Sequence, residues 1–513
     1  MTLSHKLGLD RGIVGLQSVT PLPAFSDPEF PHQWHLRNDG MNGMIAGEDI
    51  NVLPVWADGI NGTNVVVGII DDGFETDHPD LASSWLPELS YDFTNGSTAQ
   101  EASEARRALR AHGTRCAGQI IGALNNGICG VGVAYGARWA SEIFSSRHAM
   151  DALEAAALSW QSADIAVYSA SWGPPDDGAT FDGPGPLTRR VLARMVQSGR
   201  QGLGNIFVVA SGNGGMQGDN CNCDGYANSR YTIAVGAIDS AGMLPPYAEQ
   251  CAAHLIVAYS GAFGLGLTTT DVGGQCTASH TGTSASTPLA VGVMALVLSI
   301  RPDLTWRDVQ HVFVEAAVQN HADDGSWTRN GAGRWVSHKY GFGRLDAVQA
   351  IAVARSHTAV GPDLDPLVLQ DAAASLIPTM DPSLPRQGPR QGLIRTLVVA
   401  RDPTVPSSLA LHALETVEVE VTLTHPSRGH VAITLVSPAG TLSQLLTYRP
   451  RDVSAEGLTS WVLTTVRCWG ESPVGTWQLH VHDARLGDSD YETGRPWELG
   501  TLVSWSLRLY GTC

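Results

Sequence analysis

The sequence predicts two domains of different fold class: an α/β domain built on a doubly wound parallel sheet, and a smaller all-β domain after it. Three observations support this prediction. Over about 300 residues, short β-branched runs alternate with longer apolar runs of helical length, which is typical of a parallel sheet covered by helices. Six prolines then fall between residues 361 and 392. Beyond them the apolar residues recur at every second position, which indicates a β-sandwich or barrel.

These patterns divide the 513 residues into four parts. Residues 1–26 are mixed in character and form an N-terminal extension, and residues 27–354 form the α/β domain. The proline-containing stretch 355–395 has little periodicity and is interpreted as a linker or a wrapping segment. Residues 396–513 form the all-β domain, with the cleanest alternation in Val417–Leu423.

The first strong strand signal is Asn64–Ile70, a β-branched run bounded by Gly62 and Gly73. The run ends in Asp71 and Asp72. Because α/β folds place their sites at the carboxyl ends of parallel strands, these acids are candidates for chemistry. A helix cap or a turn residue is an equally good explanation for a single aspartate at such a position.

The remaining α/β elements follow in alternation. His112 heads a helix of small residues, where a histidine is normally a cap or surface residue. Ser284 lies in the small-residue turn His280–Pro288 before an apolar helix, and an ordinary N-cap is the simpler explanation for it. Thr305 and Asp308 resemble a capping box. The further strands and helices are expected at 165–169, 187–197, 206–210, 233–237, 289–298 and 306–318.

Net charge, cysteine content and hydropathy limit the partners and the cellular locations that we expect for this protein. The net charge of −18 argues against nucleic acid or an anionic membrane as the main partner, and it suits metal cations or basic peptides, although solubility explains it equally well. Eight cysteines are compatible with a few disulfides. The sequence contains no run of about 18 apolar residues that would predict a transmembrane helix. Met1–Lys6 lacks the apolar core of a signal peptide, so we expect either a cytosolic protein or a chain whose start is missing.

Three of the candidate residues stand in a meaningful order. Asp71, His112 and Ser284 follow the Asp–His–Ser order of the subtilisin triad, in which the histidine takes the serine proton and the aspartate orients the histidine. Asn213 follows the strand 206–210, where its amide can donate to an oxyanion, a contact worth about 10²–10³ in rate. Each motif alone is weak, but together the four predict a nucleophilic serine site.

With these residues identified, the sequence resembles the kexin/furin branch of the subtilases, the proprotein convertases. The resemblance extends from about Asp27 to Thr512 and implies a subtilisin-like α/β domain followed by a jelly-roll-like P domain. Among vertebrate members, segments such as Thr465–Glu471 are most similar to the type seven convertase. The family motifs stand at Asp71–Gly73, His112–Gly118, Ser169–Pro174, Ala210–Gly215, Cys221–Tyr226, His280–Ser286, Leu304–Asp308, Leu435–Pro438, Gly475–Trp477 and Leu509–Thr512.

The resemblance implies a calcium-dependent serine endoprotease that cleaves precursor proteins after arginine, at sites with one, two or more basic residues. The residue before the cut, P1, needs a carboxylate partner, and the match assigns this to Asp176 and Asp224. Asp72 would face a basic residue at P2, and Glu154 and Asp182 would face P4. Calcium binding or plain solvation is the alternative explanation for these acids.

Two calcium sites are implied, each with oxygen ligands of the kind that Ca²⁺ prefers. The same resemblance pairs Cys129 with Cys276 and Cys221 with Cys251, and leaves Cys116 and Cys223 free. Cys468 has only Cys513 as a remaining partner, and this pair is not predicted. The implied ligands are Asp176, Asp219 and Glu249 for one site, and Asp27, Asp80 and Asn126 with the carbonyls of Ala123, Ile128 and Gly130 for the other.

Two segments depart from the family pattern. Residues 94–111 lack an Asp-Pro-Asp-Pro run, so a third calcium site is not expected, and Leu109 stands where the family has a second acid for P2. Residues 139–149 replace a usual strand, with Ser146 in the place of an aspartate. Pro175 replaces a glutamate before the P1 acid. Because these changes remove negative charge, we expect strong selectivity for arginine at P1 with looser demands at P2 and P4.

The family also implies partners and a location. A propeptide of its own is an expected partner, and membrane attachment is expected only through a tail; we expect the sequence to be either a mature core or an incomplete gene model that lacks both. The expected location is the secretory pathway: the Golgi or trans-Golgi network, the cell surface or the medium. Two other functions remain open. A misplaced triad would leave a convertase-like binding protein, and a broad degradative subtilase is disfavoured by Asp176, Asp224 and the P-like domain.

Overall fold

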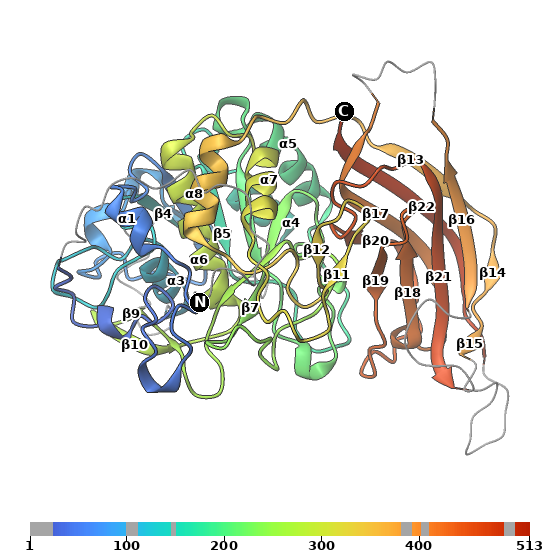
Figure 1. Cartoon of the computed structure of the whole chain (residues 1–513), viewed down its shortest axis with the longest axis horizontal. Coiled ribbons are helices and arrows are strands. Elements are labelled where there is room, and N and C mark those ends of the chain that lie inside the picture. The colour runs from blue at the N-terminus through green and yellow to red at the C-terminus, as the bar shows by residue number, and fades with distance from the viewer. Residues whose placement is uncertain (1–23, 99–110, 145–149, 381–391, 402–409, 487–497) are drawn as a thin grey trace, which may run out of the picture.

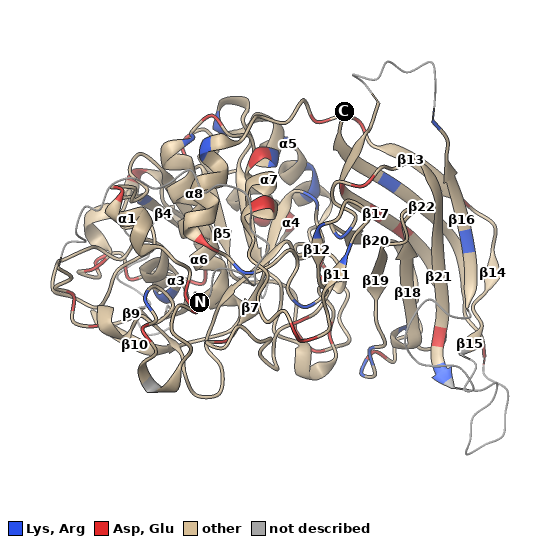
Figure 2. Cartoon of the chain, in the orientation of Figure 1, with Lys and Arg blue, Asp and Glu red and all other residues tan. Residues whose placement is uncertain are grey.

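The structure is a computed structural model that describes residues 24–98, 111–144, 150–380, 392–401, 410–486 and 498–513. Figure 1 shows the α/β domain and a β-sandwich lying side by side along the long axis of the molecule. Charged residues are scattered over both domains, in keeping with a chain in which only 16% of residues are charged (Figure 2). Both predicted fold classes are confirmed.

The α/β domain is organised around an eight-stranded sheet in the order β3-β2-β4-β1-β5-β6-β7-β8, parallel except for β3. Strand β1 pairs with β4 on one side and β5 on the other, so the strand order reverses beside β1. This reversal is where α/β sheets bind ligands. The strands are β1 Val66–Asp71, β2 Tyr91–Asp92, β3 Ser97–Thr98, β4 Arg138–Ile143, β5 Val167–Ala170, β6 Ile206–Ala210, β7 Thr232–Ile238 and β8 Ile256–Tyr259.

Helices lie on both sides of this sheet (Figure 1). Helix α6, Thr283–Ile300, is long and apolar enough to cross a membrane, but most of it is buried inside the α/β domain, so we interpret it as a core helix. The other helices are α1 Leu53–Ala57, α3 Ala111–Ile121, α4 Asp151–Ala157, α5 Pro186–Gly202, α7 Trp306–Ala316 and α8 Ala347–Ser356. Short 3₁₀ turns occur at Phe30–His32, Met41–Gly43, Ala82–Ser84, Pro87–Leu89, Gly215–Gln217, Cys221–Cys223 and Arg428–His430. Two small hairpins complete the domain: β9 Leu267–Asp271 with β10 Gln275–His280, and β11 Thr328–Arg329 with β12 Trp335–Val336.

The second domain is a sandwich of two five-stranded sheets. One has the order β13-β22-β17-β20 with β14 also on β22, and the other β15-β21-β18-β19 with β16 also on β21. Alternate side chains such as Val417, Val419 and Val421 are fully buried between the sheets, as the period of two predicts. The strands are β13 Leu367–Asp371, β14 Ser375–Leu376, β15 Thr379–Met380, β16 Leu393–Val399, β17 Ala413–Thr424, β18 Val431–Val436, β19 Leu442–Leu446, β20 Leu458–Thr465, β21 Gly475–Leu486 and β22 Thr501–Thr512.

The stretch 355–395 is more than a linker. Its residues 367–371 form strand β13, which pairs along β22. Strand β14 also pairs with β22, whereas β15 pairs with β21 of the other sheet. The predicted boundary after residue 395 falls inside β16. The prolines flank these short strands instead of interrupting them, because proline is tolerated at the edges of sheets. Residues 1–23 of the predicted N-terminal extension lie outside the described residues.

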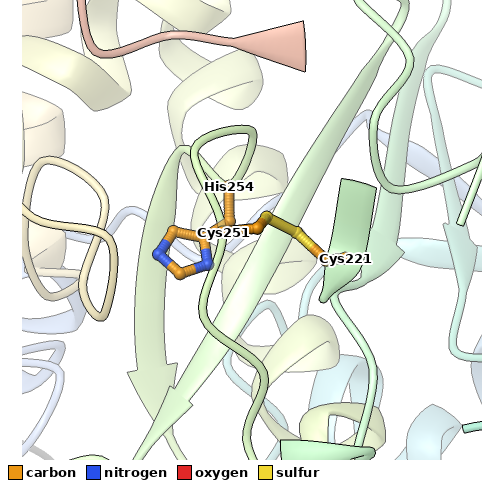
Figure 3. A group of neighbouring side chains, drawn as sticks. All are labelled: Cys221, Cys251 and His254. Atoms are coloured by element: carbon orange, nitrogen blue, oxygen red, sulfur yellow. A yellow bond between two sulfur atoms is a disulfide. The ribbon is translucent and has the colours of Figure 1, made fainter. Parts of the chain in front are cut away.

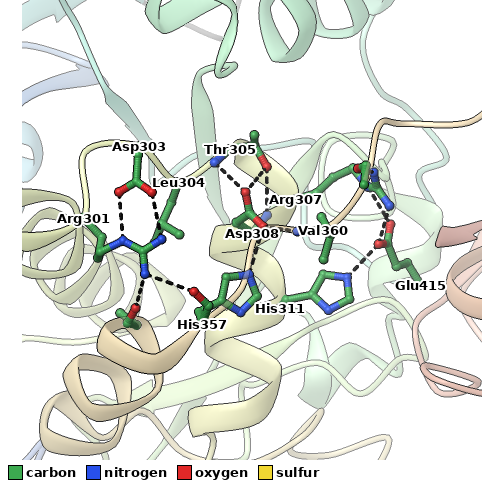
Figure 4. Close-up of polar contacts among 12 residues, drawn as sticks. Arg301, Asp303, Leu304, Thr305, Arg307, Asp308, His311, His357, Val360 and Glu415 are labelled. Carbon is green, nitrogen blue, oxygen red and sulfur yellow. Dashed lines mark hydrogen bonds and ion pairs between the residues drawn. The ribbon is translucent and has the colours of Figure 1, made fainter. Parts of the chain in front are cut away.

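A buried ionic cluster joins the two domains beside helix α7 (Figure 4). Arg307 donates two hydrogen bonds to Glu415 of β17, at 2.9 and 2.7 Å, and His311 Nε2 lies 2.6 Å from the same carboxylate. Burial alone would raise the pKa of Glu415, but these partners hold it below its usual range. The predicted capping box is confirmed: Asp308 N donates to Thr305 Oγ1 at 3.1 Å, and Thr305 N donates to Asp308 Oδ2 at 2.9 Å.

Candidate active site

Asp71 and His112 meet at the carboxyl end of strand β1. Asp71 is the last residue of the strand and His112 the second of helix α3, and Asp71 Oδ1 lies 2.7 Å from His112 Nδ1. The next residue, Gly113, must be a glycine, because a Cβ there would lie 2.4 Å from the carbonyl oxygen of Gly73. The Asp71 carboxylate raises the pKa of His112 to about 9, against the opposing effect of burial. The pair therefore has the geometry of a base and its orienting carboxylate.

Ser284 lies on the first turn of helix α6, half-buried at the rim of a cavity. The turn before it needs Gly282, whose φ of 84° is in the left-handed region that favours glycine. The Ser284 hydroxyl donates to the carbonyl oxygen of Ser171 at 3.2 Å. The ring of His280, at the start of this turn, packs edge-on to His112 with the centroids 5.8 Å apart. The serine turn and the base thus share one neighbourhood.

Asn213 faces the same serine turn from the loop after strand β6. Its Oδ1 accepts hydrogen bonds from the backbone nitrogen and the hydroxyl of Thr283, at 2.8 and 3.1 Å. Because these bonds occupy the amide oxygen, the amide nitrogen is left to donate, and it lies 3.4 Å from Asp176. A donor held in this way beside a nucleophile can stabilise an oxyanion.

The cavity between these residues has a volume of about 160 Å³ and contains two acids. Burial, together with the nearby Asp176 and Asp219, raises the pKa of Asp224 to about 7, although Tyr226 N and Ala227 N donate to its carboxylate. Burial also raises the pKa of Asp176. A guanidinium group entering this cavity would form charge-assisted hydrogen bonds with both carboxylates, and its single positive charge would reduce their mutual repulsion. The cavity is lined by Ser171, Trp172, Gly173, Pro174, Asp176, Ala210, Gly212, Asn213, Asp224, Thr283 and Ser284.

Three further predicted acids lie around this cavity. Asp72 reaches the surface beside Asp71, and burial of its carboxyl together with the Asp71 charge raises its pKa to about 7. Glu154 accepts a hydrogen bond at 2.7 Å from the hydroxyl of Tyr226, and Tyr226 is two residues after Asp224 in the chain. Asp182 is exposed and forms a backbone bridge with Asp224. These three acids do not line the cavity itself: Asp72 is next to Asp71, while Glu154 and Asp182 are connected to Asp224 through Tyr226 and the backbone bridge.

Comparison with known families agrees with this geometry. A family profile described as the subtilase family matches residues 62–343, which is more than half of the chain. The chain belongs to the subtilase family. A second profile, the proprotein convertase P-domain, matches residues 414–509 of this subtilase.

Curated relatives match nearly the whole of this subtilase. Human furin is 40% identical over 489 residues, covering 95% of the chain and 58% of furin. The human proprotein convertase subtilisin/kexin type 4 is 41% identical over 493 residues, covering 95% of the chain and 61% of the relative. Furin-like protease 1 of Drosophila melanogaster is 41% identical over 498 residues, covering 96% of the chain and 37% of the relative. The chain thus spans about six-tenths or less of these relatives, and its similarity to the type seven convertase stays a prediction.

A solved structure supports the arrangement of both domains. The serine protease of Aeromonas sobria superposes with a TM-score of 0.82 at 23% identity, covering 98% of each chain. The same protease bound to its chaperone also gives a TM-score of 0.82, at 24% identity. At such low identity the likeness shows the fold alone, including the P domain beside the subtilase domain.

Calcium dependence is general in this family. Among the acids predicted as calcium ligands, Asp27, Asp80 and Glu249 are buried. Burial, with a contribution from Asp27, raises the pKa of Asp80 to about 7, and within the described residues neither acid is paired with a basic side chain. Burial and the neighbouring Asp219 and Asp176 raise the pKa of Glu249 far above its usual range. Buried carboxylates of this kind are the ligands that Ca²⁺ prefers.

Some of the predicted calcium ligands contact one another in pairs: Asp176 and Glu249 share a side-chain hydrogen bond, and Asn126 contacts Asp80. In the described part of the chain, two groups of three His, Cys, Asp or Glu side chains have their potential ligand atoms within 4.8 Å of one another. Neither group contains a predicted calcium ligand. Two carboxyl groups approach as closely as Asp176 and Glu249 do only when a proton or a cation neutralises them, so a calcium ion would take the place of the proton between these two. Asn126 Nδ2 donates to Asp80 at 2.8 Å, so its amide would have to turn to offer its oxygen to an ion.

The two predicted disulfides are present in the subtilase domain. Cys129 is bonded to Cys276, and Cys221 to Cys251. His254 lies beside the second bond (Figure 3), and burial, aided by Arg467, lowers its pKa to about 4. Because bonded sulfurs are not thiolate ligands, we interpret this group as a disulfide packed against a neutral histidine, and not as a metal site. The remaining cysteines are free: Cys116, Cys223, Cys468 and Cys513.

Two contacts of the site were not predicted. Ser171 bonds to Ser284 twice: its backbone carbonyl oxygen accepts from the Ser284 hydroxyl at 3.2 Å, and its own hydroxyl donates to the Ser284 carbonyl oxygen at 3.3 Å. Cys116 Sγ lies 3.6 Å from the carbonyl oxygen of Ser284, on the buried side of helix α3. Three residues were predicted to depart from the family pattern. Pro175, which precedes Asp176, is exposed, and Leu109 and Ser146 lie outside the described residues.

Proposed function

We propose that this subtilase is a calcium-dependent serine endopeptidase that cleaves precursor proteins after arginine, at sites with one, two or more basic residues. One observation carries the proposal. The cavity that holds Ser284 and Asn213 also holds Asp176 and Asp224, two carboxylates with raised pKa values. Such a cavity is poorly suited to an apolar side chain, because that side chain would cover the two carboxylates without giving either of them a cationic partner. An arginine side chain offers both of them a partner at once.

The mechanism assigns one role to each predicted residue. Ser284 Oγ attacks the carbonyl carbon of the scissile bond while His112 takes its proton, and His112 later gives this proton to the leaving amine. Asp71 holds Nδ1 of His112 at 2.7 Å, which keeps the other ring nitrogen available to the serine. The amide nitrogen of Asn213 donates to the oxyanion that forms. In the free structure the Ser284 hydroxyl donates to Ser171, and it must turn toward His112 when substrate binds.

Calcium has a supporting role in this proposal. Asp176, Asp219 and Glu249 would hold one ion behind the arginine cavity, and Asp27, Asp80 and Asn126, with carbonyls of Ala123, Ile128 and Gly130, would hold the other. A bound ion supplies positive charge that lets these carboxylates stay ionised and close together. Asp176 belongs both to the cavity and to this ligand set, so the ion would hold Asp176 in place while the carboxylate itself contacts the P1 arginine.

Substrate preference beyond P1 follows from the acids that remain. We expect Asp72 to favour a basic P2 residue, and Glu154 and Asp182 to favour a basic P4 residue, without the additional acids of the family. The P4 preference is tested by changing P4 Arg to Ala in a peptide with P1 Arg. We expect a loss of about tenfold in kcat/KM, as for a rim charge pair, and a loss of a hundredfold or more would contradict it.

We also propose that its substrates are precursor proteins of the secretory pathway, where furin-type relatives act, and that a propeptide of its own is a further partner. The alternative is a convertase-like binding protein without catalysis. Its basis is the Ser284 hydroxyl, which is bonded to Ser171 in this structure.

An activity assay separates these proposals. An internally quenched peptide with an Arg-Arg site is incubated with the wild type and with Ser284→Ala, first in calcium and then in EDTA. We expect cleavage after arginine by the wild type in calcium only, and none by Ser284→Ala. Binding without cleavage by the wild type would favour the binding protein, and equal cleavage of peptides with an apolar P1 would favour a broad degradative enzyme.

A further inference from the structure

A loop that belongs to the arginine cavity is held in place by the other domain. The loop runs from Asp176, the acid proposed for P1, to Asp182, the acid proposed for P4. Two P-domain arginines contact its middle: Arg428 donates to the carbonyl oxygen of Ala179 and Arg449 to that of Thr180, each at 2.8 Å. These bonds are made to the backbone, so they fix the path of the loop whatever its side chains are.

Both guanidinium groups also lie over one aromatic ring of this loop. The guanidinium carbons of Arg428 and Arg449 are 4.3 and 4.6 Å from the centre of the Phe181 ring. The same ring packs edge-on against Trp461 of the P domain, with 5.2 Å between the ring centres. Cation–π contacts of this kind are strongest where water is excluded. The loop is therefore held from the P-domain side by its backbone and its largest side chain together.

Arg449 makes a second contact with the site through Asp219. Its guanidinium lies 2.9 Å from Asp219 Oδ1, while Asp219 Oδ2 accepts a hydrogen bond from Gly178 N at 2.8 Å. Asp219 thus connects the P-domain arginine to Gly178, which is two residues after Asp176 near the start of the loop. The side chain of Arg449 is 1% exposed, so this ion pair is shielded from water. A shielded pair of this kind is held far more rigidly than a surface pair.

The charges at this contact alternate in sign, and the last pair crosses from the P domain to the subtilase domain. Arg428 pairs with Asp452 at 2.7 Å, Asp452 lies 3.3 Å from Arg449, and Arg449 pairs with Asp219. By contrast, the hydrogen bonds described for Asp71, His112, Asn213 and Ser284 are all made within the subtilase domain. The P domain therefore reaches the recognition side of the cavity and not its reacting side.

We propose that Arg449 is a positioning residue for the arginine cavity and sets the selectivity for arginine over lysine at P1 from outside the subtilase domain. The inference rests on the proposed function. An arginine at P1 needs two carboxylates in register with its planar fork, whereas a lysine is a point charge that tolerates displaced acids. Loosening the loop should therefore weaken recognition of arginine more than that of lysine. The reacting groups, and with them kcat, should change little.

The test compares paired peptides that differ only in P1 Arg or Lys. The variants are Arg449→Lys, which keeps the charge but loses the fork, and Phe181→Leu, which keeps every charge but removes the ring. Arg508→Met is the matched control, because this P-domain arginine pairs with Glu420 at 2.5 Å, within the same domain. Folding is checked by circular dichroism and thermal unfolding. In addition, each change is placed on Ser284→Ala, and binding of the two peptides is measured by calorimetry.

We expect Arg449→Lys and Phe181→Leu to raise KM for the arginine peptide about tenfold with kcat within about twofold, and to lower the Arg/Lys ratio accordingly. Calorimetry should show the same loss of affinity, and Arg508→Met should match the wild type. Folded variants that keep the wild-type ratio would overturn the inference alone, as would an equal fall in all three variants. A wild type that neither binds nor prefers arginine would overturn the proposed function, and the inference with it.

Discussion

The two sides of the cavity are built in different ways. The reacting side, with Asp71, His112 and Ser284, rests on strand β1 and helices α3 and α6 of a single domain. The recognition side is a loop that depends on P-domain arginines for part of its hydrogen bonding. The residues proposed for bond cleavage and those proposed for choice of substrate thus have separate structural supports in this molecule. Changes on one side should therefore leave the other largely intact.

The largest effect is expected on the reacting side. Ser284→Ala removes the nucleophile, and we expect kcat to fall by about 10⁴–10⁶. Peptide binding should be unchanged, because Ser284 contributes no charge to the arginine cavity. Turnover measured by fluorescence and affinity measured by calorimetry give the two numbers. A variant that loses both equally would show that the two sides are not separable.

Removing an acid from the recognition side should have a smaller and selective effect. For Asp224→Asn we expect kcat/KM for a P1 Arg peptide to fall about 10²-fold, since one partner of a buried charge pair is lost. A matched peptide with P1 Leu serves as the control and should not lose activity. A parallel fall for both peptides would indicate damage to the reacting side as well.

The pH dependence links the two sides through Asp72. The pKa of His112 is raised to about 9, chiefly by Asp71 and in part by Asp72, and the base works only when deprotonated. Activity should therefore rise with pH through the neutral range toward 9. Asp72→Asn removes one charge that raises this pKa, so the acid limb of kcat/KM should move to lower pH. A limb that stays in place would show that Asp72 acts on substrate alone.

The smallest effect on activity is expected beneath the site, at Glu142. This residue of strand β4 is fully buried, neither carboxylate oxygen has a hydrogen-bond partner among the described residues, and burial raises its pKa far above the usual range. The folded chain keeps this group protonated at neutral pH, whereas the unfolded chain loses the proton, so stability should fall as pH rises above the unfolded pKa.

Replacing Glu142 tests whether the reacting side depends on this packing. Glu142→Val should raise the free energy of unfolding by about 1–3 kcal/mol at neutral pH and flatten its pH dependence. Glu142→Gln is the matched control, because it removes the charge but keeps a buried polar group. Denaturant unfolding at several pH values gives the stability, and kcat for both variants should stay near the wild type. Destabilisation by valine would mean that the carboxyl group has a stabilising partner.

The sequence by itself was sufficient to predict both fold classes and the order of the candidate triad. The periods of 2 and 3.6 residues are local properties, and each predicted residue of the site stands at the end of such a pattern. The capping box at Thr305 could be predicted for the same reason, since both partners lie within one turn. The site acids and the two disulfides came from family motifs that are also local in the chain.

Other features were decided only by the tertiary structure. Leu367–Asp371 has no strong period of its own and becomes a strand because β22 offers it an edge. In the sequence Arg449 and Asp219 are ordinary charged residues, 230 positions apart, and Glu142 is an ordinary polar one. Arg449 and Asp219 acquire their roles where the two domains meet, and Glu142 acquires its role inside the α/β domain; in both places water is excluded, which strengthens a paired charge and makes an unpaired one costly. Burial of this kind depends on the whole assembled fold, so no local pattern records it.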